Sequence, residues 1–192
     1  MSRNTRSCAS ERVARSLAAA WLAFALATTP AHAVNVGPPP LPASVVDLAP
    51  GLLAQGGGEL KFFGISVYDG WYWSRARGWP NGGPYALDLL YHRNIDGAMI
   101  AQRSVDEIAK LGYGSASERT RWGELMTRIF PDVQRGDRLT GVYTRAGAVR
   151  YFHNGKPIGE IVEPGFAQAF FGIWLDPRSS RADFRQKLLG EQ

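Results

Sequence analysis

The sequence predicts an α+β domain in which an antiparallel sheet carries helices on one face. Two segments before residue 93 are rich in aromatic and β-branched residues, which suit strands. Two amphipathic helical patterns follow them, and three short segments joined by tight turns come next. The 192 residues are enough for one domain with one core. The tight turns favour a meander over alternating βαβ units.

Residues 1–33 have the features of a secretory signal peptide. Arginines precede the apolar run Leu17 to Ala27, and Ala31-His32-Ala33 matches a small-x-small cleavage site. We therefore expect cleavage after Ala33 and a periplasmic or secreted protein. The apolar run is shorter than the roughly 20 residues of a spanning helix, so no stable membrane insertion is expected after cleavage. Cys8 is the single cysteine, which leaves the processed chain without thiol or disulfide chemistry.

Charge excludes one class of partner. The chain carries a net charge of +5, of which the leader holds +3, so the rest is close to neutral. Scattered charges at near-neutral balance are untypical of a nucleic-acid binder, and no nucleic-acid partner is expected.

The first half of the domain is predicted to hold a linker and two strands. Residues 34–58 contain five prolines and five glycines, which indicates a Pro/Gly-rich linker or first strand, with a short strand around residues 44–48. The compact domain, residues 59–192, begins with a long strand over Leu60 to Trp73, in which Asp69-Gly70 marks a bulge or bend. Alternation along this strand places the following residues on one face: Phe63, Ile65, Val67, Trp71 and Trp73. A second strand, Tyr85 to Arg93, alternates in the same way.

The second half is predicted to alternate between helices and hairpin strands. Gly97 to Leu111 and Glu118 to Phe130 are amphipathic, and Gly112 and Pro131 end them. The remaining elements are strands over Asp137 to Thr144, Ala148 to His153 and Lys156 to Val162, and helices over Phe166 to Leu175 and Arg181 to Leu189.

Several motifs in this order resemble the bacterial chalcone isomerase-like family. They are the run Gly58 to Asp69, Tyr85 to Asp88 with Tyr91-His92-Arg93, Phe130 to Val133 with Gly136 to Leu139, Phe166-Ala167 with Phe170 to Leu175, and Leu188-Leu189-Gly190. The resemblance covers about Glu59 to Gly190. It implies a chalcone isomerase-like open-faced sandwich, in which a long, curved antiparallel sheet carries helices on one face and a ligand cleft lies between them.

The resemblance also bears on catalysis. Plant chalcone isomerases position a phenolate with an Arg and a Thr on early strands, a Tyr and an Asn around the first helix, and a Ser or Thr on a late helix. Here the matching positions fall at Phe63, Asp96, Arg103 and Ala167, and no arginine occurs between residues 15 and 75. A developing oxyanion needs a preorganised cation or donor. We therefore expect no true chalcone isomerase activity, and no catalytic residue is identified.

Four residues are candidates for the polar end of a ligand site. Tyr68 ends the part of the first long strand that precedes the Asp69-Gly70 bend, Tyr91 and Arg93 continue the inward face of the second, and Ser104 borders the apolar face of the first helix. The alternative is structural, with Arg93 paired to a helix acid such as Glu107 and both tyrosines in the core. No cofactor and no metal are expected, because only two histidines remain after cleavage and no cysteine does.

Three functions from different classes fit these observations. The first is an exported domain that binds a small apolar or amphipathic molecule, such as a lipid or an aromatic acid. The second is an isomerase or lyase with a rearranged polar set. The third is an accessory protein without a ligand, which docks to an unknown protein partner through exposed Trp71, Trp73 and Trp79.

Overall fold

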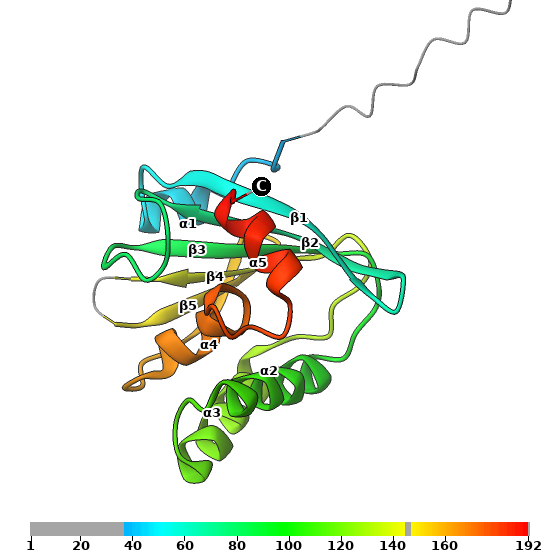
Figure 1. The fold of residues 1–192 in the computed structure, drawn as a ribbon, viewed down its shortest axis with the longest axis vertical. Coiled ribbons are helices and arrows are strands. Elements are labelled where there is room, and N and C mark those ends of the chain that lie inside the picture. The colour runs from blue at the N-terminus through cyan, green and yellow to red at the C-terminus, as the bar shows by residue number, and fades with distance from the viewer. Residues whose placement is uncertain (1–36, 145–146, 192) are drawn as a thin grey trace, which may run out of the picture. The chain divides into compact units, whose positions relative to one another are not determined.

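A six-stranded antiparallel sheet forms the centre of the computed structural model, which describes residues 37–144 and 147–191 (Figure 1). The strands pair in chain order: β1 (Leu53–Phe62), β2 (Ile65–Ser74), β3 (Tyr85–Tyr91), β4 (Arg138–Tyr143), β5 (Val149–His153) and β6 (Lys156–Ile161). The meander and the predicted fold class are confirmed. The predicted signal peptide lies outside the described residues.

Four helices cover one face of the sheet. They are α2 (Gly97–Leu111), α3 (Ala116–Ile129), α4 (Phe166–Leu175) and α5 (Ala182–Leu189). Gly112 ends α2 in the left-handed conformation, as its sequence predicts. Ser115 and Glu118 form a capping box at the start of α3. Within the described residues, no helix is long and apolar enough to cross a membrane.

The main core lies between the sheet and these helices. Alternate residues of β3 point into it, namely Tyr85, Leu87, Leu89 and Tyr91, as the period-two pattern predicts. Helix α4 is buried on nearly all sides and packs Phe170 and Phe171 against the sheet. The alternating strand β3 and the apolar helix α4 therefore meet in one core.

The opposite face of the sheet carries a smaller layer that corrects the linker prediction. Residues 43–48 are a helix, α1 (Ala43–Leu48), and not a strand. Val45 of α1 packs on Trp73 and Phe152 in a second hydrophobic cluster. The prolines before α1 therefore lead into a helix that belongs to the domain.

Beside this cluster, the side chain of Asp88 is fully buried and accepts hydrogen bonds from Arg138 Nε at 2.7 and 2.8 Å and from Thr140 Oγ1 at 2.7 Å. Arg138 also donates to the backbone oxygens of Pro39 and Pro40. This ion pair thus ties the segment that precedes α1 to the sheet.

The predicted strand over Leu60 to Trp73 is two strands. The chain reverses at Phe63 and Gly64, which have φ values of 48° and 77°, and β1 extends back to Leu53 through three glycines. A Cβ on Gly56 would lie 2.1 Å from the backbone oxygen of Lys187, so the glycines admit helix α5 rather than loosen a linker. Composition alone cannot separate these two uses of glycine.

The bend predicted at Asp69-Gly70 is also wrong. Both residues pair regularly within β2, with Leu90 and Leu89 of β3 as their partners. A Cβ on Gly70 would lie 2.8 Å from the ring of Phe184, so this glycine too makes room for α5.

Candidate functional site

A cavity of about 420 Å³ lies between the first strands of the sheet and helices α2 and α4. Most of its lining is apolar, and the polar residues come from β2, β3, α2 and the segment before α5. The lining residues are Leu60, Phe62, Val67, Tyr68, Leu89, Tyr91, Ile95, Met99, Ile100, Arg103, Ser104, Glu107, Phe130, Leu139, Phe170, Ile173, Trp174, Ser180 and Arg181. The structure thus brings three of the four candidate residues, Tyr68, Tyr91 and Ser104, to one cavity.

The two tyrosines form part of one wall on adjacent strands. Tyr68 pairs with Tyr91 in the register of β2 and β3, and their rings meet edge to face with centroids 5.6 Å apart. Burial raises the pKa of Tyr68 to about 12, against the opposing effect of the hydrogen bond that its hydroxyl accepts from Trp174 Nε1 at 2.8 Å. Burial, and to a smaller extent the neighbouring Tyr68, raises the pKa of Tyr91 further above its ordinary value than that of Tyr68. Both phenols are therefore neutral at pH 7.

Tyr91 and Ser104 differ in the hydrogen bonds that they can still form with a ligand. Among the residues that the structure describes, no group bonds to the hydroxyl of Tyr91, which is left as a donor at the cavity. Ser104 uses its own hydrogen within helix α2, because its Oγ donates to the backbone oxygen of Ile100 at 2.9 Å. Ser104 can only accept a bond from a ligand while that contact persists.

One edge of the cavity is charged. The nearly buried carboxylate of Glu107 is contacted by Arg103 Nη2 at 2.6 Å, Lys110 Nζ at 3.0 Å and Ser180 Oγ at 2.7 Å. Burial by itself would raise the pKa of Glu107. The hydrogen bonds from Ser180 and Lys110, with the charge of Arg103, outweigh burial and lower this pKa. Glu107 is therefore ionised and compensated by more than one cation.

Two cations at this edge were missed by the sequence prediction. Helical periodicity predicts that Arg103 lies on the polar face of α2, yet its guanidinium carbon lies 6.0 Å from the ring centre of Phe62 at the cavity edge. Arg181 donates to the backbone oxygen of Lys61 at 2.7 Å and contacts Asp183. The i,i+4 spacing of Arg103 and Glu107 could have predicted the ion pair that places Arg103 at this edge. Nothing in the sequence pairs the segment before α5 with β1.

The structure places the fourth candidate, Arg93, outside the lining of this cavity. Strand β3 ends at Tyr91, and Arg93 is exposed in the following bend and does not line the cavity. The alternative pairing of Arg93 with Glu107 is wrong as well, because Glu107 contacts Arg103 and Lys110. Alternation was extended two residues past the end of the strand, where the backbone no longer keeps side chains on one face.

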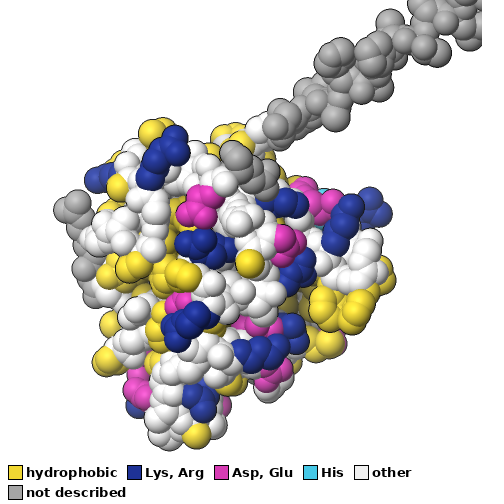
Figure 2. All heavy atoms as spheres, viewed as in Figure 1, with side chains coloured by type: hydrophobic (Ala, Val, Ile, Leu, Met, Phe, Trp, Pro, Cys, Tyr) yellow, Lys and Arg dark blue, Asp and Glu magenta, His cyan; other side chains and the backbone are white. Residues whose placement is uncertain are grey.

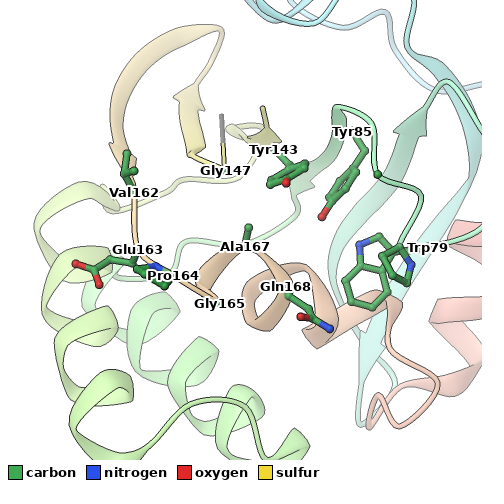
Figure 3. A pocket seen from close by; sticks show the side chains of 12 residues that line it. Trp79, Tyr85, Tyr143, Gly147, Val162, Glu163, Pro164, Gly165, Ala167 and Gln168 are labelled. Atoms are coloured by element: carbon green, nitrogen blue, oxygen red, sulfur yellow. The ribbon is translucent and has the colours of Figure 1, made fainter. Parts of the chain in front are cut away.

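A second cavity of about 520 Å³ lies at the other end of α4 (Figure 3). The stacked rings of Tyr85 and Tyr143 and the indole of Trp79 line it, together with Ala167. Ala167 was matched by resemblance to the late-helix hydroxyl of the enzymes, yet it faces this cavity and not the one that holds Tyr68. Phe63, matched to the early Thr, projects from the β1–β2 turn and lines neither cavity.

The tryptophans proposed as an exposed docking surface are not exposed. Trp73 is buried and Trp71 packs against the same outer cluster. Trp79 packs against the main core. Among the described residues, no three His, Cys, Asp or Glu side chains gather in a way that could hold a metal ion.

The fold and the main cavity define an α+β domain in which a mostly apolar cavity lies between a meander sheet and its helices. The chain belongs to the chalcone isomerase-like family, whose sequence model matches residues 87–190. These residues include the cavity walls from β3, α2 and α4. The expected family and fold are thereby confirmed.

Two relatives add detail. A fatty-acid binding protein of Arabidopsis thaliana has a similar fold, with a TM-score of 0.53 at 12% identity over 75% of this chain and 90% of that one. An uncharacterized protein of Haemophilus influenzae is 30% identical over 109 residues, which are 56% of this chain and 52% of that protein. The chain thus spans about half the length of this bacterial relative.

Proposed function

We propose that this protein is an exported domain that binds a small amphipathic acid, such as a lipid or an aromatic acid, without chalcone isomerase activity. The main cavity carries the proposal, because a volume of about 420 Å³ with a mostly apolar lining and polar groups at one edge suits one small ligand. The fatty-acid binding protein with the same fold supports this ligand class.

The charged edge gives the ligand an orientation. An apolar chain or ring fills the space beside Leu89 and Phe170, and its carboxylate lies near Arg103 and Arg181. Arg103 is more than half exposed and contacts Glu107 through Nη2, and its guanidinium carries further N–H donors for a ligand. The hydroxyl of Tyr91 supplies a further donor inside the cavity.

The same groups argue against ring closure of a chalcone. The two cavity arginines lie at the cavity edge and not on the early strands, where the resemblance places the cation of the enzymes, and both tyrosines have raised pKa values that disfavour an anionic catalyst. A developing oxyanion would meet few preorganised positive partners. Spectroscopic assay of the purified protein should show no acceleration of chalcone cyclisation. Robust turnover that is lost when Tyr91 is replaced by Phe would instead establish the isomerase alternative.

Paired ligands test the binding proposal directly. We expect a medium-chain fatty acid to bind more tightly than its methyl ester, and Arg103→Met with Arg181→Met to remove that preference. One charge-assisted hydrogen bond contributes about 1.5–3 kcal/mol. At about 1.4 kcal/mol per decade, this is a ten- to hundredfold loss of acid affinity. Ester affinity should change little, because methionine keeps the aliphatic bulk.

Arg93→Met provides the matched control, since Arg93 is an exposed arginine that does not line the cavity. It should bind acid and ester as the unmodified protein does. Failure of acid, ester and co-purified lipid to appear in native mass spectra would refute the binding proposal. Equal losses of acid and ester in the double variant would refute the assigned orientation.

Export is supported by the leader alone. The arginine-rich start, the apolar run Leu17 to Ala27 and Ala31-His32-Ala33 motivate cleavage before Val34. N-terminal sequencing of the protein recovered from the periplasm or the medium should begin at Val34. An intact N-terminus on a protein retained in the cytoplasm would refute export.

A further inference from the structure

Exposed apolar side chains gather at the edge of the main cavity. In the described part of the chain, seven large hydrophobic side chains are exposed, and four of them form what we term the apolar tip: Phe62, Phe63, Ile65 and Met99. Phe62 and Met99 also line the cavity, and the ring centres of Phe62 and Phe63 are 4.5 Å apart. Figure 2 shows hydrophobic side chains with Lys and Arg beside them at the edge where Figure 1 places the β1–β2 turn. The apolar tip is therefore continuous with the cavity.

The backbone conformation at Phe63 is unfavourable for a bulky residue. Phe63 has a φ of 48° and is 90% exposed. Bulky residues rarely adopt this left-handed conformation, which Asn and Gly favour at such turns. The β5–β6 turn shows the usual solution, with Asn154 and Gly155 at φ values of 50° and 76°. An exposed Phe in the place of Asn stabilises neither the turn nor the core, which points to a role outside the folded chain.

We propose that the apolar tip inserts into the surface of a phospholipid bilayer and lets the cavity exchange its ligand with that membrane. The inference rests on the proposed function and names the source of the ligand. Amphipathic acids partition into bilayers, and a cavity whose edge is buried in the headgroup region can receive them without passage through water.

The shape and charge of the apolar tip favour a lipid surface. The turn projects from the end of the β1–β2 hairpin (Figure 1), whereas a protein interface of ordinary size needs about 800 Å² on each partner. Lys61, Arg103 and Arg181 flank the apolar tip, and such long side chains reach the headgroups while their stems stay apolar. Carboxylates pair with all three, so insertion is mainly apolar, with a modest preference for anionic lipid.

Phe63→Asn is the decisive variant. It copies the β5–β6 turn and leaves the cavity lining intact, so its melting temperature should equal or exceed that of the unmodified protein. Binding to phosphatidylcholine vesicles containing phosphatidylglycerol, measured by co-sedimentation, should fall at least tenfold because one aromatic side chain no longer enters the apolar layer. High salt should weaken the binding of the unmodified protein only modestly.

Leu53→Asn is the matched control. Leu53 is also exposed, but it begins β1 at the end of the strand opposite the apolar tip. All proteins are purified from cells that express the full-length chain, and mass spectrometry confirms that they share one N-terminus. Vesicle binding of Leu53→Asn should match that of the unmodified protein.

The outcomes separate this inference from the proposed function. No vesicle binding by the unmodified protein, or equal binding by Phe63→Asn, would overturn the inference. Self-association or protein capture that depends on Phe63, without vesicle binding, would also overturn it and assign the apolar tip to a protein partner. A fluorescent medium-chain acid in vesicle-free buffer tests the cavity alone, and Phe63→Asn should bind it normally. Vesicle binding that depends on Phe63 without binding of the acid would refute the cavity proposal and leave membrane docking standing.

Discussion

Replacement of Arg138 by methionine should destabilise the domain strongly, although Arg138 lies on the face of the sheet opposite the main cavity. Its guanidinium contacts both carboxylate oxygens of Asp88, whose side chain is fully buried. Methionine would leave that carboxylate with the hydroxyl of Thr140 as its remaining side-chain donor among the described residues. It would also remove the bonds to the backbone of Pro39 and Pro40.

The expected loss follows from the buried charge. Removal of one partner of a buried ion pair costs about 3–5 kcal/mol, because the other charge stays in a poorly polarisable environment. With a urea m-value of about 2 kcal/mol/M, the unfolding midpoint should fall by about 1.5–2.5 M. Urea titration followed by tryptophan fluorescence and circular dichroism measures the shift.

A second variant isolates the cause. Asp88→Asn combined with Arg138→Met removes the uncompensated charge and keeps a side chain that can bond to Thr140. The double variant should recover at least half of the loss. If it is no more stable than Arg138→Met, the loss comes from the contacts to Pro39 and Pro40. If Arg138→Met costs less than about 1 kcal/mol, a value typical of an exposed pair, the reasoning from burial fails.

Three further predictions concern helix α5, acid stability and the cavity. Gly56→Ala should displace α5, because the new Cβ would lie 2.1 Å from the backbone oxygen of Lys187. The free energy of unfolding from urea titrations should fall by more than about 1–3 kcal/mol. An unchanged urea midpoint would contradict the close approach of α5 to β1. Hydrogen bonds from Arg178 and, to a smaller extent, Tyr113 outweigh burial and hold the pKa of Asp176 well below its ordinary 3.8. The contribution of Asp176 to stability is therefore present above about pH 4 and is lost as the pH falls further. As the pH is lowered from 7 to 2.5, the melting temperature of Asp176→Asn should decline less steeply than that of the unmodified protein. Val67→Trp should fill the main cavity and weaken binding of a medium-chain acid at least tenfold with little change in melting temperature, and unchanged affinity would place the ligand elsewhere.

Local patterns determined much of the fold. The alternation of Tyr85, Leu87, Leu89 and Tyr91 identified the central strand and the face that it buries. Helical periodicity with a terminal glycine placed helix α2 at its observed bounds. The Asn154-Gly155 turn marked the last hairpin. These signals act over a few residues, so the chain records them without reference to partners far away.

The site was only partly predictable for the same reason. Tyr91 and Ser104 lie on the inward faces of their own elements, and periodicity therefore directs them to the cavity. Tyr68 was predicted from its place before the Asp69-Gly70 pair and not from alternation. Arg93 lies beyond the end of β3, where alternation no longer applies. No local pattern indicates that Arg181 contacts the backbone of Lys61.

Tertiary packing determined the structural role of the glycines in β1 and the exposure of Phe63. The same glycines suit a linker or a strand, and only the approach of helix α5 to Gly56 selects the strand. Phe63 continues an apolar pattern that suggests a buried position, yet the reversal of the chain turns it outward to 90% exposure. The sequence by itself determined the fold class and the inward faces of β3 and α2, because periodicity is local. The single face predicted for the first strand was wrong, because Phe63 and Ile65 are exposed at the turn and Trp73 packs in the outer cluster. The edge of the cavity, with its arginines and its apolar tip, was decided by which distant segments meet there.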